Sequence, residues 1–277
     1  MGKLKTYGSD KLQYNAENLP QILHWVTPNS RVLEFGPAMG YMTHYMKNTL
    51  NCSITAVELS EEMAQHAKKH TEKIIIANLD TDAWENEIEG TFDYILFADV
   101  LEHLRDPEKV LQSASSFLKP NGSILTSIPN IGHSAIILSL LDGEFNYTTY
   151  GLLDTTHIHF FTRKSIQNMM SNCKLGCLAE RNSIKNPANT ELRKFFIQHI
   201  ASIPSIITKK DILVYQFINQ WKRESEIDNA VVFTGQKLNL FRKTLAIFDD
   251  INEFIAYKYN YRFKLPSRLN KRVRNKD

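Results

Sequence analysis

Acidic residues and a glycine follow two apolar runs of this sequence at the positions where strands would end. Glu34 and Gly36 close the run 31–35, and Glu58 closes the run 53–59. Ligands of open α/β sheets bind at the carboxyl ends of the strands. A glycine there lets a ligand approach the backbone, and a carboxylate can accept hydrogen bonds from both hydroxyls of a ribose. These residues therefore predict a site for a ligand that contains a ribose.

The glycine spacing after the first run does not match a dinucleotide-binding turn. That turn has glycine at the first, third and sixth positions of G-x-G-x-x-G. Counted from Gly36, the third and sixth positions hold Ala38 and Tyr41, and the second glycine of this turn is Gly40. The mismatch points away from a ligand with a pyrophosphate group.

Two further apolar runs end in residues that suit an adenine base and a reactive group. Asn78, Leu79 and Asp80 end the third run, where Leu79 can pack on a base and the polar pair can bind its edge. Asp99 ends the fourth run. We expect all four to lie at the same edge of the sheet as Glu58.

Apolar runs alternate with helical segments along the first half of the chain, which is typical of a parallel sheet covered on both faces. The expected strands are 31–35, 53–59, 73–78, 92–99 and 122–129. One helix begins after the cap Ser60; another begins after the cap Asp106 and is expected to stop at Pro120–Gly122. Further on we expect strands in 175–185 and 212–221, helices after Thr162, in 190–203 and from about 236, and an irregular cover segment between the fifth strand and Thr162.

The composition indicates a folded protein whose charge is unevenly distributed. The chain has 277 residues, 43% of them hydrophobic, which is enough for a substantial core. The net charge is +3, yet residues 257–277 hold eight Lys or Arg against one Asp. We expect this basic tail to be a solvated end, or a contact for an anionic membrane surface or a protein partner. The acidic remainder argues against nucleic acid as a partner.

The cysteines and the N-terminus bear on the cellular compartment. Cys52, Cys173 and Cys177 can neither all pair nor form a zinc set. The N-terminus lacks the apolar core of a signal peptide, and no apolar run is long enough to span a bilayer. We expect a protein of the reducing cytoplasm, peripheral at the inner membrane if the tail binds lipid.

From about residue 25 to 180 the chain resembles the class I S-adenosylmethionine-dependent methyltransferases. In that family an acid and G-x-x-x-G follow the first strand, as Glu34, Gly36 and Gly40 do here. Further similar blocks are AVELS, FDYILFADVLEHLRDPEKVL, LKPNGSILTSIPN and GLLDTTHIHFFTRKSI. The last block resembles a bacterial subgroup that methylates small molecules and glycans.

The resemblance implies a Rossmann-like sheet of seven strands with helices on both faces, and S-adenosylmethionine as the cofactor. Two positions depart from the family: Ala38 replaces the usual middle glycine, and Asn78 replaces the usual acid of the third motif. The implied cofactor contacts are Glu34, Gly36, Pro37, Gly40, Glu58, Leu59, Asn78, Leu79, Asp80, Asp99 and Val100. The chain then divides into an N-terminal segment (1–28), a methyltransferase domain (29–222) with its cover segment (131–161), and a helical, basic extension (223–277).

Histidines are the candidates for the base, because a hydroxyl acceptor must lose a proton and imidazole titrates near neutrality. His103 follows the fourth strand, and His157 and His159 lie in the cover segment. We expect His157 to be the base and His103 to be the second candidate. His159 faces the opposite way if the segment is extended. The alternative role for His157 is to tie the cover to the sheet.

A metal-dependent alternative rests on one helical turn. Asp99, Glu102 and His103 fall at i, i+3 and i+4, and His157 precedes FFT. This arrangement resembles the small-RNA 3′-end 2′-O-methyltransferases, in which two carboxylates and two histidines bind a divalent metal. Because Asp99 is shorter than the usual Glu and no second acid is near His157, we expect no metal here.

The resulting hypothesis is O-methylation of a sugar or a related small molecule in glycan or surface-polysaccharide assembly. Tyr147, Tyr150, Phe160 and Phe161 are candidates to stack on the acceptor, or are buried aromatics of the cover. One alternative is a metal-dependent RNA 2′-O-methyltransferase. The other is a catalytically silent subunit that binds the cofactor.

Overall fold

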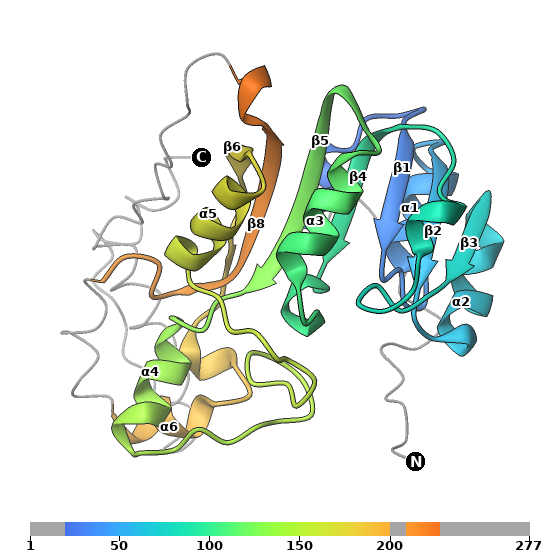
Figure 1. The fold of residues 1–277 in the computed structure, drawn as a ribbon. Helices are drawn as coiled ribbons and strands as arrows, with labels where there is room; N and C mark the ends of the chain where they lie inside the picture. The colour runs from blue at the N-terminus through green and yellow to red at the C-terminus, as the bar shows by residue number, and fades with distance from the viewer. Residues whose placement is uncertain (1–19, 200–208, 228–277) are drawn as a thin grey trace, which may run out of the picture.

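An open mixed β-sheet runs through the protein and has helices packed on it (Figure 1). The computed structural model describes residues 20–199 and 209–227. The strand order is β3-β2-β1-β4-β5-β8-β6, and β7 pairs with β8. The strands are β1 (Arg31–Phe35), β2 (Ser53–Glu58), β3 (Lys73–Ile76), β4 (Phe92–Ala98), β5 (Leu118–Pro129), β6 (Leu175–Glu180), β7 (Ser183–Ile184) and β8 (Val214–Arg223). The α-helices are α1 (Tyr41–Asn48), α2 (Glu61–Ala67), α3 (Pro107–Ser115), α4 (Ser134–Leu141), α5 (Arg163–Asn172) and α6 (Arg193–Gln198).

Strands β1 to β5 form a parallel half-sheet, as the sequence predicts. Phe35 aligns with Val57 of β2 on one side and with Phe97 of β4 on the other. All three side chains are buried, because helices cover the sheet on both faces. The strand order reverses beside β1, so the turns after β1 and β4 lie next to each other. Such a switch point is where ligands of this sheet type bind.

The helix that begins after Asp106 ends earlier than its proline and glycine signals predict. α3 stops at Ser115, and β5 already begins at Leu118. Leu118 is buried, and the N–H of Phe92 donates to the carbonyl oxygen of Phe117 at 2.8 Å. Pairing with β4 therefore takes this segment into the sheet before Pro120 is reached.

The remaining strands form an antiparallel edge, and with them the described sheet has one strand more than the seven predicted. β8 pairs antiparallel with both β5 and β6, and the predicted strand 175–185 is divided into β6 and β7. A buried guanidinium fixes this edge: Arg163 at the start of α5 donates to both carboxylate oxygens of Asp211 and forms an ion pair with Glu180. The sheet thus has eight strands in its described part.

The cover over the carboxyl end of the sheet is built from two segments that are distant in sequence. One runs from α4 to residue 161, and the other contains a 3₁₀ turn (Pro187–Asn189) and α6. They share a hydrophobic core of their own, which consists of Ala135, Ile136, Leu138, Leu152, Leu153, Leu192, Phe195 and Phe196. Figure 1 shows α4 and α6 together beyond the lower end of the sheet. The cover is therefore a packed subdomain, not a single long loop.

The neck of the first cover segment is closed by backbone pairing. Asn130 and Phe161 form an isolated parallel β-bridge, and the N–H of Ile131 donates to the carbonyl oxygen of Phe161 at 2.9 Å. The side chain of Asn130 also donates to the carbonyl oxygen of Val214 on β8. The segment therefore leaves and re-enters the sheet at one point.

Several predicted features lie outside the described residues. They are the start of the N-terminal segment, the end of the predicted helix 190–203, the helix from about 236 and the basic tail 257–277. Within the described part, no helix combines the length and the apolar character that a membrane span requires.

Candidate functional site

The turn after β1 is packed tightly against its surroundings, and its backbone has three residues with positive φ. These are Gly36 (φ 65°), Ala38 (φ 48°) and Gly40 (φ 75°). A Cβ atom on Gly40 would lie 2.8 Å from the Cα atom of Ala67, so α2 leaves room for glycine only. The turn is thereby held close to the switch point of the sheet.

Glu58, at the end of β2, fixes this turn from the side. Its Oε2 atom accepts the N–H of Ala38 at 3.0 Å, and its Oε1 atom accepts the N–H of Ser60 at 2.9 Å. The carboxylate is 8% exposed. Two carboxylate oxygens offer about four acceptor positions, so capacity for two further donors remains.

Glu34 lies beneath the same turn and is fully buried. The hydroxyl of Thr43 donates to its Oε2 atom at 2.7 Å, whereas Oε1 has no hydrogen-bond partner in the part of the chain that the structure describes. Burial raises the pKa of Glu34 to about 7, against the lowering effect of the Thr43 hydrogen bond, and the nearby Glu58 adds a smaller upward contribution. The raised pKa favours the neutral form of Glu34 more strongly than in an exposed glutamate.

The residues after β3 are engaged mainly with one another and with the turn after β4. The side-chain oxygen of Asn78 accepts the N–H of Asp80 at 2.9 Å. The carboxylate of Asp80 in turn accepts the N–H of Arg105, at 2.9 and 3.1 Å to its two oxygens. Leu79 packs against the central core. Asp80 thus links the ends of β3 and β4.

Asp99, directly after β4, has a positive φ of 54°. Its Oδ1 atom accepts hydrogen bonds from the amide of Gln216 at 2.7 Å and from the hydroxyl of Ser127 at 3.4 Å. Burial raises the pKa of Asp99 to about 6, although both hydrogen bonds lower it. This carboxyl group lies where the parallel half of the sheet meets β8.

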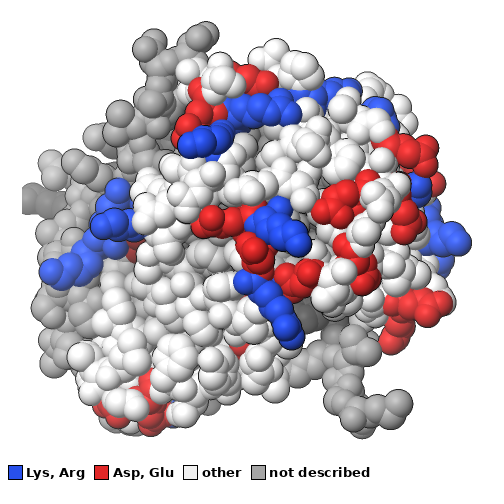
Figure 2. Space-filling view, in the orientation of Figure 1, with Lys and Arg blue, Asp and Glu red and all other residues white. Residues whose placement is uncertain are grey.

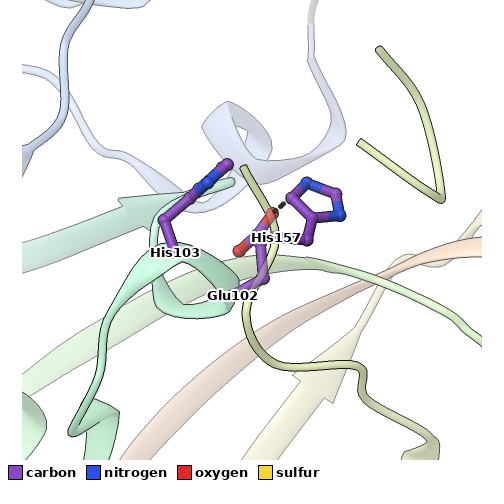
Figure 3. Close-up of side chains that lie close together, drawn as sticks. All are labelled: Glu102, His103 and His157. Atoms are coloured by element: carbon purple, nitrogen blue, oxygen red, sulfur yellow. Dashed lines mark ion pairs between the residues drawn. The ribbon is translucent and has the colours of Figure 1, made fainter. Parts of the chain in front are cut away.

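Glu102, His103 and His157 form a cluster in which three ligand-type atoms, one from each side chain, lie within 4.8 Å of one another (Figure 3). Glu102 and His103 come from the 3₁₀ turn after β4 (Leu101–His103), and His157 comes from the cover. The carbonyl oxygen of Glu102 accepts the N–H groups of Ile158 and His159, both at 3.0 Å. Backbone pairing therefore brings the cover to the turn after β4.

Backbone carbonyl oxygens fix the tautomers of both histidines. The Nδ1 atom of His157 lies 3.3 Å from the carbonyl oxygen of Leu152, and the Nδ1 atom of His103 lies 3.1 Å from that of Thr156. A carbonyl oxygen can only accept, so each contact requires the proton on Nδ1. In the neutral rings both Nε2 atoms consequently have free lone pairs. Burial lowers the pKa of His157, and His103 lowers it further, which favours the neutral form.

The carboxyl group of Glu102 is 1% exposed, and neither oxygen has a hydrogen-bond partner among the described residues. The Oε1 atom lies 3.9 Å from Nε2 of His157, too far for a hydrogen bond. Burial raises the pKa of Glu102 well above its ordinary value, and the charge of Asp99 raises it further. A buried acid without partners beside two imidazole lone pairs indicates a reactive or ligand-binding site.

Aromatic rings of the cover lie beside the cluster. Phe160 contacts the ring of His157 at a centroid distance of 6.3 Å, and Phe145 and Tyr147 contact Phe160 at 5.6 and 6.2 Å. Phe145 and Tyr147 are exposed. A row of rings thus leads from the surface to His157.

A family model described as a methyltransferase domain matches residues 7–177, which is more than half of the chain. The chain belongs to the class I S-adenosylmethionine-dependent methyltransferases. The resemblance stated from the sequence is confirmed at the level of the family.

Curated relatives of the methyltransferase include enzymes named ubiquinone biosynthesis O-methyltransferase. That of Xanthomonas campestris is 29% identical over 122 residues, which is 43% of this chain and 51% of the relative. That of Xanthomonas euvesicatoria is 28% identical over 120 residues, which is 42% of this chain and 50% of the relative. The chain therefore spans about half the length of the curated relatives it matches.

Solved structures with a similar fold share little sequence with the methyltransferase. A possible histamine N-methyltransferase from Thermotoga maritima has 16% identity and a TM-score of 0.49, and the match covers 73% of this chain and 86% of that one. Magnesium protoporphyrin IX methyltransferase from Synechocystis, solved with S-adenosylhomocysteine, has 12% identity and a TM-score of 0.48, and the match covers 71% and 75%.

The cofactor of this family is S-adenosylmethionine, and the geometry at the end of β2 fits its nucleoside. Glu58 retains acceptor capacity for the two ribose hydroxyls after binding Ala38 and Ser60. Leu59 beside it is 68% exposed, which leaves an apolar face available to a base. The turn after β1 lacks the full glycine spacing of a pyrophosphate-binding turn, and this cofactor has no pyrophosphate.

The structure brings the predicted site residues together in two groups. Those at the ends of β1, β2 and β4 lie around the switch point, Asp80 links the end of β3 to the turn after β4, and His103 and His157 meet beside Glu102. His159 points elsewhere: its Nε2 atom lies 3.2 Å from the carbonyl oxygen of Arg105. Sequence reasoning did not single out Gln216, because only the antiparallel pairing of β8 brings it to Asp99.

Proposed function

We propose that this methyltransferase methylates a hydroxyl oxygen of a small molecule, and that His157 takes the proton from that hydroxyl. The observation that carries the proposal is the fixed tautomer of His157, whose Nε2 lone pair lies beside Glu102 in a buried position. A neutral imidazole in this state is a suitable general base. His103, with its own Nδ1 atom bonded to Thr156, is the second candidate.

The proposed roles divide the site into a cofactor side and an acceptor side. Glu58 would hold the ribose, Leu59 would pack on the base, and Asp99 would lie near the reactive sulfur. When bound, the cofactor supplies a methyl group on a positively charged sulfur, which keeps the bonding electron pair when the methyl leaves. The acceptor oxygen forms the new O–C bond, and its proton passes to Nε2 of His157. Positioning and exclusion of water by the cover supply much of the acceleration.

We propose an acceptor that presents a flat ring face to the aromatic row of Phe145, Tyr147 and Phe160. Aromatic side chains stack on such faces. Figure 2 shows few charged side chains over the α4 and α6 region, which suits an acceptor of low charge on that side. A sugar of glycan or polysaccharide assembly meets this requirement and is our first candidate. The name of the curated relatives supports a second class, intermediates of ubiquinone biosynthesis, and supports oxygen as the methylated atom.

Two measurements test this proposal in sequence. Calorimetry with S-adenosylhomocysteine should detect binding, and calorimetry with NADH should not. Transfer from labelled S-adenosylmethionine is then measured with UDP-glucose and UDP-N-acetylglucosamine as sugar acceptors and with catechol as a hydroxylated aromatic ring. Labelled product with either class supports O-methylation and identifies the acceptor type. Tight cofactor binding with no transfer to any oxygen acceptor would favour the silent subunit.

A second candidate function is metal-dependent methylation, including that of an RNA 3′ end. It is supported by the unpartnered oxygens of Glu102 and by the two free Nε2 atoms, which together resemble a ligand set for a divalent cation. Asp99 is not part of that cluster, because its carboxylate is bonded to Gln216 and Ser127. Activity that EDTA abolishes and Mn²⁺ or Zn²⁺ restores, together with metal content lost in Glu102→Gln, would establish this candidate and replace His157 as the base.

We also propose, from the sequence alone, that the basic tail (257–277) binds an anionic membrane from the cytoplasmic side. Flotation of the full chain with anionic liposomes at low and high salt, compared with a chain that ends at Tyr257, tests it. Equal behaviour of the two chains would remove the idea.

A further inference from the structure

The backbone of Leu152 is held from both sides by two side chains that come from different parts of the cover. Its N–H donates to Oε1 of Glu191 at 2.7 Å. Its carbonyl oxygen accepts from Nδ1 of His157 at 3.3 Å. Glu191 and His157 are thus connected through one residue, the backbone of Leu152.

Glu191 is seated firmly against this part of the cover. The hydroxyl of Tyr215, on β8, donates to its Oε2 atom at 3.2 Å. On the other side, Gly151 has a φ of 89°, and a Cβ atom there would lie 2.2 Å from Oε1 of Glu191. The carboxylate therefore occupies the space that any side chain at position 151 would need.

The residues around the contact between Glu191 and Leu152 are tightly packed and hold it in place. Leu152 and Leu153 are almost completely buried, and they pack with Leu192, the residue after Glu191, in the core of the cover. The carbonyl oxygen of Leu153 accepts from the N–H of Thr148 at 2.7 Å. The carboxylate of Glu191 thus joins the two cover segments at the N–H of Leu152. The carbonyl group of the same residue orients His157.

We propose that Glu191 is a positioning residue for His157: it fixes Leu152, and the Leu152 carbonyl then keeps the proton of the neutral imidazole on Nδ1 and the lone pair on Nε2. Without Glu191, the N–H of Leu152 loses its acceptor. The backbone at residues 151–152 can then rotate, and the carbonyl oxygen of Leu152 can move away from Nδ1 of His157. The imidazole then loses the contact that selects its tautomer. Loss of the partner that orients a metal-bound histidine typically costs 10- to 100-fold in activity or metal affinity, and we expect a loss of about this size here.

The expected loss of activity rests on the proposed function, because it requires His157 to be the base. The effect of Glu191 on the tautomer of His157 does not depend on that function. The primary readout is therefore the ¹⁵N NMR spectrum of the His157 ring in the full chain, because Nδ1–H and Nε2–H tautomers have different nitrogen shifts. We expect the Nδ1–H form in the wild type and a mixed population with Nε2–H in Glu191→Ala. Glu191→Gln should retain the wild-type spectrum, since its amide oxygen can still accept from Leu152.

Two further variants separate this effect from a general loss of structure. Gly151→Ala displaces the carboxylate from the opposite side and should give the same mixed tautomer. Glu144→Ala is the matched control, because Glu144 is a carboxylate of the same subdomain that forms an ion pair with Lys194 and is not part of the hydrogen-bonded connection from Glu191 through Leu152 to His157. It should leave the spectrum, the melting temperature and the affinity for S-adenosylhomocysteine unchanged.

The results distinguish failure of this inference from failure of the proposed function. A pure Nδ1–H spectrum in both Glu191→Ala and Gly151→Ala, with the fold intact by circular dichroism, would overturn the role of Glu191. An equal tautomer change in Glu144→Ala would overturn it as well. If instead the tautomer shifts as expected but His157→Ala retains full transfer, Glu191 still positions the ring and only the base assignment is wrong. If Glu191→Ala does not fold, Gly151→Ala and Glu191→Gln decide the matter.

Discussion

The imidazole rings of His103 and His157 lie edge to face with their centroids 4.8 Å apart. One ring comes from the turn after β4 and the other from the cover. Each has its Nδ1 atom bonded to a carbonyl oxygen of the cover, at Thr156 and Leu152. The pair therefore exists only when the cover is docked on the sheet, and this links cover position to base chemistry.

Replacing His157 with alanine should lower kcat by about 10²- to 10⁴-fold, the usual contribution of a general base. The dissociation constant for S-adenosylhomocysteine should change little, because the ring lies on the acceptor side. His103→Ala should lower kcat less, because the His103 ring packs against His157 but is only the second candidate for the base. The measurement is steady-state kinetics with the acceptor found in the panel above.

His159→Ala is the matched control for these two variants, because its ring contacts the carbonyl oxygen of Arg105 outside the cluster. It should retain kcat within about threefold, which corresponds to about 0.6 kcal/mol. Equal losses in all three variants would show that the histidines serve the fold and not the reaction.

The acid limb of the pH profile should lie below pH 6.5. Burial and the neighbouring His103 lower the pKa of His157 from its ordinary value. The neutral, proton-accepting form therefore persists as the pH falls, and kcat/KM should stay constant until the pH approaches that lowered pKa. A limb above pH 6.5 in the wild type, or an unchanged limb in His157→Gln, would assign the titration to another group.

Much of the fold was accessible from the sequence because the signals were local. The five parallel strands follow from short apolar runs, and the caps of α2, α3 and α5 follow from Ser60, Asp106 and Thr162, each of which accepts a backbone N–H of its helix. The end of α3 was predicted wrongly, since burial of Leu118 beside β4 outweighed the proline and glycine signal.

The candidate site was accessible where its residues follow a strand end or belong to a motif. Glu58 and the glycine turn are readable from residues 34–58, Glu102 and His103 from the segment after the fourth strand, and His157 from the block GLLDTTHIHFFTRKSI. The contribution of Gln216 and Glu191 depends on β8 and on the second cover segment, which are placed by packing between residues far apart in sequence. Neither residue belongs to a sequence pattern, so no local signal could have selected them.

Replacing Glu58 with alanine should weaken S-adenosylhomocysteine binding by about 100-fold, because two hydrogen bonds to a carboxylate are worth about 1.5–3 kcal/mol each before reorganisation. The loss also releases the N–H of Ala38 and loosens the turn after β1. Calorimetry measures the effect. Glu62→Ala, an exposed acid of α2, serves as the control and should bind as the wild type does. Wild-type affinity in Glu58→Ala would place the ribose elsewhere.

Glu34 should make the stability of the cofactor-free protein depend on pH. Its pKa is about 7 in the folded state and 4.5 when exposed. A raised pKa means that its contribution to stability is fully present below pH 4.5 and is lost as the pH rises to about 7. The difference of about 2.5 pKa units corresponds to about 3 kcal/mol.

Glu34→Gln should remove this dependence. Urea unfolding of both proteins between pH 4.5 and 8 tests it: the variant should gain stability relative to the wild type as the pH rises across that window. A constant difference between the two proteins would show that Glu34 does not titrate there.

Gly40→Ala should destabilise the protein by about 3 kcal/mol, the sum of a strained positive φ and a backbone overlap. A Cβ atom at this position would lie 2.8 Å from the Cα atom of Ala67, and α2 would have to move. Gly143→Ala separates the two effects, because Gly143 has a similar φ of 71° but no atom of residues 20–199 or 209–227 within 4 Å of the added Cβ. It should cost only about 1 kcal/mol, the strain alone. Urea unfolding measures both variants, and an equal cost would show that α2 yields without penalty and that the tight contact does not hold the turn after β1.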